Sequence, residues 1–380
     1  MNSVILRLGI ISFFGDLSSE MLYPITPIFI TTVLGASMTS LGLIEGSAEA
    51  ISNILKIYSG RWSDRIQKRK PFIVVGYVFA SLSKPLTGLA NVWTDVLMAR
   101  CFDRVGKGLR TAPRDAMLSE SVEPEKRGHA FGLHRAMDTM GATIGPLFAI
   151  LFLTFYHGEL RTIYFLAFIP GLISVLLALS IREIKVEVKK EERIPWKWKE
   201  LPHPFKNYLM AWTVFSLTNS SDVFLLLKVK QAGGSTTLTI LLYVFYNLLY
   251  STMSPYFGKR SDQIPRKKVL LFGLMVFSLV YFGFAFATAT WHFWLLFGLY
   301  GIYMAATEGV GKALAVDLFD PRFKATAIGI LGTSTGIATV LASTIAGAIW
   351  DSWGSQWAFI YTASGAFVGA FILQAKIKNR

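Results

Sequence analysis

The sequence of 380 residues contains little cysteine and little charge for its length. Its single cysteine, Cys101, excludes a disulfide framework and any zinc or iron–sulfur site built from several thiolates. Only 16% of the residues are charged and 53% are hydrophobic, whereas an ordinary soluble domain has about 25% and about 45–50%. The Gly-Lys pairs at 106, 258 and 311 lack the other residues of a phosphate-binding loop. These absences disfavour a soluble enzyme and an ATP-driven motor.

Apolar stretches of about 20 residues, the length that crosses the hydrocarbon as a helix, dominate the chain. Twelve are predicted, at residues 5–33, 39–59, 71–91, 94–118, 129–155, 160–181, 207–230, 236–257, 269–288, 291–314, 325–348 and 355–375. The pattern predicts an all-α membrane protein with twelve transmembrane helices and almost no room for another domain.

Basic residues gather in alternate joints between these stretches. The segments 61–70, 120–128, 182–206, 259–268, 320–324 and 376–380 contain 25 Lys or Arg, and the intervening joints contain one, Arg161. This asymmetry predicts cytoplasmic termini and a multi-pass protein of the cytoplasmic (inner) or plasma membrane. Because the same segments carry 11 acidic residues, they account for the whole net charge of +14, so no nucleic-acid partner is predicted.

The two halves of the chain repeat the same motifs. Gly60-Arg-Trp-Ser-Asp64-Arg65 and a basic cluster follow the second stretch, and Gly258-Lys-Arg-Ser-Asp262 and a basic cluster follow the eighth. The longest hydrophilic segment separates the sixth stretch from the seventh. We therefore predict three parts: an N-terminal six-helix bundle at 1–181, a cytoplasmic linker at 182–206 and a C-terminal six-helix bundle at 207–380.

Two weaker sequence similarities between the halves support this internal repeat. The segment from Arg104 to Lys107 resembles the one from Gly309 to Lys312, and Leu17-Ser-Ser-Glu20 resembles Asn219-Ser-Ser-Asp222.

The duplicated loop resembles the signature loop of the major facilitator superfamily of transporters. In the fourth stretch, Arg100-Cys-Phe-Asp103-Arg104-Val-Gly106-Lys-Gly108 is similar to that family's Arg-x-x-Gln-Gly-x-Gly segment, with Asp103 and Arg104 replacing Gln and Gly. In the fifth, Gly141-Ala-Thr-Ile-Gly145-Pro146 resembles the Gly-Pro motif associated with exporters. The resemblance covers the whole chain and implies the fold of this superfamily, in an exporter-like subgroup.

The resemblance also implies roles for the loop residues. The gating residues are Gly60, Asp64, Arg65, Gly258 and Asp262. Asp64 would accept from the free backbone N–H groups at the start of the eleventh helix, and Asp262 would mirror it against the fifth. We read Lys68–Lys70 as a positive-inside anchor. The residues assigned to hinge or packing roles are Gly141, Gly145 and Pro146.

Twelve basic and ten acidic residues fall within the apolar stretches or at their ends. Placing them against lipid would cost about 2.5–3.5 kcal/mol each at the bilayer centre, together more than the marginal stability of about 5–15 kcal/mol of a fold. They must face a hydrated cavity or one another. Helical spacing allows this, because polar residues form one stripe on each of the first, second, fourth and fifth helices.

These stripes supply the candidate site. A carboxylate in a partly dry cavity can take up a proton on one side of the membrane and release it on the other. The proton-coupling candidates are Asp16, Glu20, Asp222, Glu45 and Glu49. The substrate-cavity candidates are Tyr23, Asp103, Arg104, Lys107, Arg110, His134, Asp138, Glu308 and Lys312. The alternative interpretation is structural ion pairing, for example between Lys107 and Asp103.

We predict a secondary active transporter, not an enzyme, which moves a small solute by alternating access. The leading interpretation is proton-coupled efflux of small organic compounds by an antiporter. The alternatives are proton-coupled uptake of a polar or anionic metabolite, export of a metal or metal chelate, and an intramembrane hydrolase. The predicted partners are a small-molecule substrate, protons and the lipid bilayer. We expect a monomer with no cofactor and no resident metal.

Overall fold

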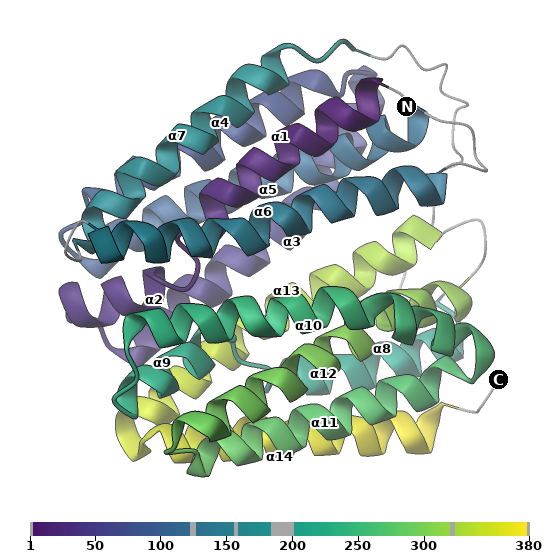
Figure 1. Ribbon diagram of the computed structural model, residues 1–380. Helices are drawn as coiled ribbons and strands as arrows, with labels where there is room; N and C mark the ends of the chain where they lie inside the picture. The colour runs from purple at the N-terminus through teal and green to yellow at the C-terminus, as the bar shows by residue number, and fades with distance from the viewer. Residues whose placement is uncertain (1–2, 122–126, 156–158, 184–200, 320–323, 378–380) are drawn as a thin grey trace. The chain divides into compact units, whose positions relative to one another are not determined.

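The structure is a computed structural model that describes residues 3–121, 127–155, 159–183, 201–319 and 324–377. Within these ranges it contains fourteen α-helices and one π-helix, and no strand (Figure 1). The predicted all-α class is therefore confirmed.

Helices account for nearly all of the described chain. Those of the N-terminal half are α1 (Ser3–Glu20), α2 (Thr26–Ile28), the π-helix η1 (Phe29–Val33), α3 (Met38–Ile66), α4 (Lys70–Gly88), α5 (Trp93–Glu120), α6 (Arg127–Phe155) and α7 (Leu160–Leu179). Those of the C-terminal half are α8 (His203–Ser216), α9 (Val223–Gln231), α10 (Thr236–Gln263), α11 (Arg266–Phe286), α12 (Thr290–Asp317), α13 (Lys324–Trp353) and α14 (Ser355–Lys376). Each predicted stretch coincides with one helix or with a broken series of helices.

Six of these helices are long and apolar enough to cross a membrane. Among the described residues these lie in α6, α7, α11, α12, α13 and α14. Charged residues lower the hydropathy of helices such as α3 and α5. The count of twelve membrane crossings therefore stays a prediction, and so does the cytoplasmic location of the termini.

Two of the predicted stretches are not continuous helices. In the stretch 5–33, α1 ends at Glu20 and the chain passes through turns to α2 and η1. Pro24 and Pro27 fall here, and proline lacks the backbone N–H that a helix interior needs.

The matching stretch 207–230 breaks between α8 and α9. Here Ser, Thr and Asn side chains compete with the helix for backbone groups. Thr218 donates its hydroxyl to the Phe215 carbonyl at 2.9 Å, and the Tyr281 hydroxyl donates to the Ser220 carbonyl at 3.3 Å. Each break lies beside an acidic residue, Glu20 in the first half and Asp222 in the second.

The chain forms two compact units, one of residues 1–36 and 47–190, the other of residues 37–46 and 191–380. In the first, α1 packs against α6 and α7, and α4 packs against α5 and α7. In the second, α8 packs against α13 and α14, and α11 packs against α12 and α14. The same order of neighbours recurs, as an internal repeat requires. Residues 184–200 of the predicted linker lie outside the described ranges, and the boundaries at 181 and 207 stay a proposal.

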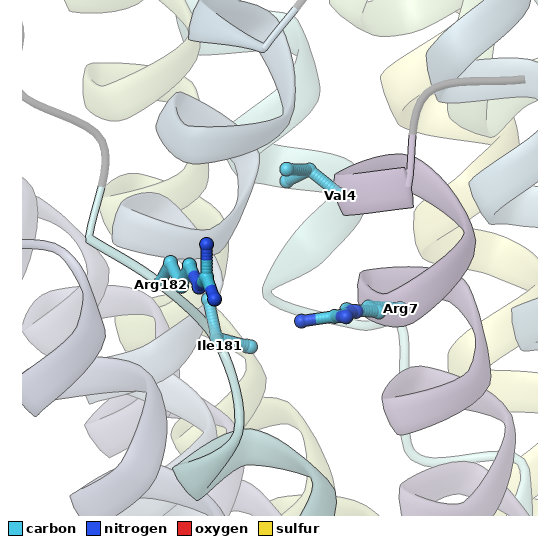
Figure 2. A pocket seen from close by; sticks show the side chains of 4 residues that line it. All are labelled: Val4, Arg7, Ile181 and Arg182. Carbon is cyan, nitrogen blue, oxygen red and sulfur yellow. The ribbon is translucent and has the colours of Figure 1, made fainter.

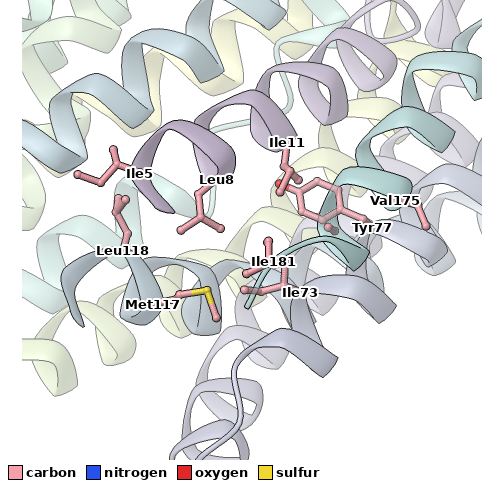
Figure 3. Close-up of a cluster of buried hydrophobic side chains, with 10 residues drawn as sticks. Ile5, Leu8, Ile11, Ile73, Tyr77, Met117, Leu118, Val175 and Ile181 are labelled. Carbon is pink, nitrogen blue, oxygen red and sulfur yellow. The ribbon is translucent and has the colours of Figure 1, made fainter. Parts of the chain in front are cut away.

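An apolar cluster holds one end of the first unit together (Figure 3). It brings together side chains from α1, α4, α5 and α7 and one side chain two residues beyond α7, namely Ile5, Leu8, Ile11, Ile73, Tyr77, Met117, Leu118, Val175, Ala178 and Ile181. Two polar residues of the candidate site, Ser12 of α1 and Arg114 of α5, lie within one helical turn of this cluster. The cluster therefore fixes the helices that carry the candidate site.

Candidate functional site

Two carboxyl groups face each other inside the first unit. The carboxyl groups of Asp16 on α1 and Asp138 on α6 lie close enough to repel each other electrostatically when both are ionised. Ser12 donates its hydroxyl to Asp138 Oδ1 at 2.5 Å, and the Arg114 guanidinium donates to Ser12 Oγ at 3.1 Å. We call Asp16 and Asp138 the carboxyl pair. The structure thus joins a residue predicted for proton coupling to one predicted for the substrate cavity.

Glycines on α6 make this approach possible. A Cβ atom at Gly141 would lie 2.5 Å from the Phe13 carbonyl oxygen, and one at Gly145 would lie 2.8 Å from the Leu17 carbonyl oxygen. Both distances are below van der Waals contact, so only glycine lets the two backbones come this close. Pro146 follows inside the same helix. The glycines therefore bring the Asp138 carboxyl group within reach of Asp16.

A buried ion pair joins α4 to α5. Lys84 Nζ lies 2.8 Å from Asp103 Oδ1, and their side chains are 7% and 5% exposed. Ser83 donates to the same carboxylate at 3.3 Å, and Arg104 lies 3.7 Å from its other oxygen. The partner of Asp103 is therefore Lys84 from the neighbouring helix, where the sequence had offered Lys107 one turn along the same helix.

Glu49 lies among basic residues on α3 and α5. Asn53 donates its amide to Glu49 at 2.9 Å and accepts from Lys56 at 3.0 Å. Lys107 and Arg104 of α5 attract the same carboxylate electrostatically. Glu49 therefore belongs to a second polar cluster within the first unit.

The other predicted residues of the N-terminal half are also shielded from the exterior. The Arg110 guanidinium lies 4.5 Å from the centre of the Tyr77 ring and donates to the Gly76 carbonyl at 3.4 Å. Glu45 and His134 are buried, and Glu20 and Tyr23 are half-buried. None of these last four side chains is fully exposed.

In the second unit, tyrosines of α10 hold two carboxylates. Tyr246 donates its hydroxyl to Asp222 at 2.6 Å, beside the break between α8 and α9. One turn further along, Tyr250 donates to Glu308 on α12, and Lys312 pairs with Glu308 at 3.2 Å. The structure thus connects the three proton-coupling and substrate-cavity candidates of this unit to α10 or to each other.

Aromatic rings surround the Asp222 contact. Tyr246 stacks with Phe297 at 5.9 Å between ring centres and meets Tyr300 edge-on at 5.3 Å. Tyr303 lies 5.5 Å from Tyr300. The second unit is therefore mainly aromatic around its carboxylate, whereas the first is ionic.

The first signature loop is tied into its own unit. Arg69 is buried and donates to Glu120 at 2.8 Å and to Ser63 Oγ at 2.8 Å. Glu183 accepts from the backbone N–H groups of Arg69 and Lys70 at 2.7 and 3.0 Å. Arg69 is thus more than the charge anchor predicted for Lys68–Lys70, because it connects the α3–α4 joint to the end of α5.

The second loop repeats this connection. Arg266 lies 3.3 Å from Asp262 and 2.7 Å from Asp317, the last residue of α12, just as Glu120 is the last residue of α5. Among the other gating candidates, Arg65 is exposed, a Cβ atom at Gly60 would lie 3.3 Å from Ala112, and Gly258 adjoins open space. The side chain of Asp64 lies outside the described part of the structure.

Sequence reasoning missed several partners of these candidates. Ser12, Lys84, Tyr246 and Tyr250 each contact a predicted site residue, and Arg114 contacts Ser12. A signal existed for Lys84, which interrupts the apolar stretch 71–91. No comparable sequence signal distinguished Tyr246 and Tyr250, because aromatic residues are common throughout these helices. No group of three or more His, Cys, Asp or Glu in the described residues could hold a metal ion.

Comparison with known proteins decides the family. The family model described as Major Facilitator Superfamily matches residues 8–231 and 208–379. The chain belongs to the major facilitator superfamily. An uncharacterized MFS-type transporter of Methanocaldococcus jannaschii is 37% identical over 372 residues, which cover 96% of this chain and 93% of the relative. This MFS protein is therefore an integral multi-pass membrane transporter.

More distant relatives agree on the fold. The multidrug resistance protein MdtH of Yersinia enterocolitica is 22% identical over 333 residues, 87% of this chain and 82% of the relative. The crystal structure of the nucleoside transporter NupG covers 100% of both chains with a TM-score of 0.78 at 14% identity. A bacterial homolog of the human lysosomal transporter Spinster covers 98% of this chain and 95% of its own, with a TM-score of 0.80 at 15% identity.

Proposed function

We propose that this MFS protein is a secondary active transporter that exports small organic compounds in exchange for protons by alternating access. The single observation that carries the proposal is the carboxyl pair. Two neighbouring carboxylates repel each other, so a pair in a partly buried site favours holding one proton between its two members. Asp16 and Asp138 are therefore built to hold a proton inside the first unit.

The surroundings of the pair couple its proton to the rest of the helix bundle. Arg114 reaches Asp138 through the Ser12 hydroxyl, and Arg110 interacts electrostatically with Asp16. Loss of the proton adds one negative charge between α1 and α6 and strengthens the attraction to both arginines. Proton binding can thus change the balance of forces among α1, α5 and α6.

Export as the direction rests on two further observations. The Gly141 to Pro146 segment resembles the exporter motif and lies against α1 in this structure, next to Asp16. The relative MdtH is named a multidrug resistance protein.

The class of substrate is suggested by the second unit. The tyrosines around Asp222 offer flat aromatic surfaces beside a carboxylate, which suit organic compounds with apolar bodies.

Uptake of a polar or anionic metabolite is the second candidate. It is favoured by Arg104 and Lys107, whose positive charges surround Glu49 in the first unit. An intramembrane hydrolase would need one catalytic centre, which does not account for the repeated order of helix neighbours in both units. The duplicated signature loops, with Asp64 and Asp262, are proposed to act as gates in either direction of transport.

The test is flux of labelled solutes in proteoliposomes under an imposed pH gradient. We expect solute movement against its own gradient, driven by protons moving the other way. Asp16→Asn and Asp138→Asn should each abolish the response to pH while saturable exchange remains. The matched control is Asp95→Asn, a carboxylate that caps α5 away from the pair. Solute and protons moving together would favour uptake, and pH-dependent flux in both pair variants would refute the assignment.

A further inference from the structure

A small cationic pocket lies at the end of the first unit, beside the apolar cluster. Val4 and Arg7 of α1 line it together with Ile181 and Arg182, which follow α7, and its volume is about 200 Å³. Figure 2 shows the Arg7 side chain extending from α1 toward the segment that carries Ile181 and Arg182. Two guanidinium groups therefore share one opening with two aliphatic side chains.

The described residues leave this positive charge uncompensated. Arg7 donates only to the Ser180 carbonyl, at 3.4 Å, and neither arginine forms an ion pair with a carboxylate in that part of the chain. Glu183 is the acidic residue nearest to Arg182 in the sequence, but both of its oxygens accept backbone N–H groups at the start of α4. Two like charges around one hollow attract an anion.

The chemistry of the pocket selects a phosphate group. A guanidinium presents paired N–H donors that match two oxygens of a phosphate, and it keeps its charge at any physiological pH.

α7, which ends two residues before Ile181, carries an exposed apolar strip. Leu172, Leu176 and Leu179 are spaced four and three residues apart, so they share one helix face, and they are 42%, 58% and 51% exposed. A phosphate attached to acyl chains would satisfy the pocket and the strip together, whereas free phosphate would use the pocket alone.

We propose that this pocket binds the headgroup of an anionic phospholipid, with Arg7 and Arg182 holding the phosphate and the leucines of α7 contacting an acyl chain. The basic loops predict that this end of the unit faces the cytoplasm, and anionic lipids concentrate in that leaflet. The site is independent of the cargo and of the proton chemistry.

The experiment titrates the purified full-length protein in detergent with phosphatidylglycerol and counts bound lipids by native mass spectrometry. Phosphatidylcholine with the same acyl chains and inorganic phosphate are the comparison probes. We expect binding of phosphatidylglycerol in preference to phosphatidylcholine, and thermal stabilisation by phosphatidylglycerol but not by inorganic phosphate. Equal stabilisation by inorganic phosphate would show a site for the free anion and overturn the lipid assignment.

Variants locate the site. Arg7→Gln with Arg182→Gln should weaken phosphatidylglycerol binding by about tenfold or more, because charge-assisted hydrogen bonds are lost from both arginines. The control, Lys259→Gln with Arg260→Gln, removes two exposed positive charges near the end of α10 and should bind like the original protein. Equal losses in both double variants would show nonspecific attraction and overturn the site. If the glutamine variant fails to fold, Arg7→Lys with Arg182→Lys decides: weaker binding supports the proposal, and unchanged binding refutes it.

Discussion

At the scale of single residues, the Lys84–Asp103 pair is the clearest case of charge held inside the protein. Both side chains are more than nine-tenths buried, and the pair joins two helices. Removing one partner of a buried ion pair leaves the other charge buried and uncompensated. Replacing both partners with apolar residues leaves no buried charge. The two kinds of substitution should therefore have very different effects on stability.

Lys84→Met should lower the free energy of unfolding by about 3–5 kcal/mol, and combining it with Asp103→Leu should restore most of that loss. Thermal or denaturant unfolding in detergent micelles measures both. The control is Lys312→Met, which breaks the half-exposed pair with Glu308 and should cost about 1 kcal/mol or less. A double variant as unstable as Lys84→Met would contradict this explanation.

At the scale of helices, the contact between α1 and α6 positions the carboxyl pair. It depends on Gly141 and Gly145, where an added Cβ atom would meet the backbone of α1. The close packing of α1 against α6 therefore shapes the candidate site as well as the fold.

Gly145→Val should separate the two helices, reduce stability by about 1–3 kcal/mol and weaken the pH response of transport. Unfolding in detergent and flux in proteoliposomes measure the two effects. Gly309→Ala is the control, because an added Cβ atom there meets nothing within 4 Å. Normal flux and stability in the valine variant would show that α6 can move away at no cost.

The helix breaks form the second feature at this scale. Replacing Asn219, Ser220 and Ser221 together by alanine should extend α8 toward α9, because alanine has the highest helix propensity and cannot compete for backbone groups. Hydrogen exchange across residues 217–222 should slow, and transport should fall because Asp222 leaves its contact with Tyr246. Faster exchange, or unchanged flux with slower exchange, would contradict the role given to this break.

Helix positions were largely predictable from the sequence, and Pro24 and Pro27 indicated the first break, whereas the second break was not predictable. Long apolar runs such as 160–181 predict a helix because only a helix satisfies its own backbone in lipid. The run 207–230 also predicts one continuous helix. Its break depends in part on the hydroxyl of Tyr281, which contacts Ser220 although 61 residues separate the two in the sequence.

At the scale of the whole molecule, the membrane topology is the main prediction still to be tested. The described residues contain six helices apolar enough to cross, and the other crossings rest on the alternation of basic loops. Because the sequence has one cysteine, a background without cysteine needs only Cys101→Ser.

In that background, a cysteine at Lys206 should react with a membrane-impermeant maleimide only from the cytoplasmic side, and one at Glu159 only from the opposite side. Labelling of intact and permeabilised cells distinguishes the two. Reaction of both cysteines from the same side would show that the chain crosses the membrane an even number of times between residues 159 and 206. That result would contradict the predicted topology.

The candidate site was predictable in composition but not in its pairings. Stripes of charge on the helices identified Asp16, Asp103 and Asp138, since helical spacing alone places such residues on one face. The partner of each depends on how α1, α4, α5 and α6 pack, and a single sequence does not encode that directly. Lys84 is 19 residues from Asp103, and Ser12 is 126 residues from Asp138.

The two units keep the same order of helix neighbours but have diverged in the chemistry of their interiors, ionic around Asp16 and aromatic around Asp222. Because the ionic residues and the aromatic residues lie in different units, substitutions in one unit can change its interior without changing that of the other. Under the proposed function, substitutions of the tyrosines of the C-terminal half change which molecules are accepted and leave the proposed proton coupling at the carboxyl pair of the N-terminal half unchanged. Hybrids that exchange whole halves between relatives would inherit the two traits separately.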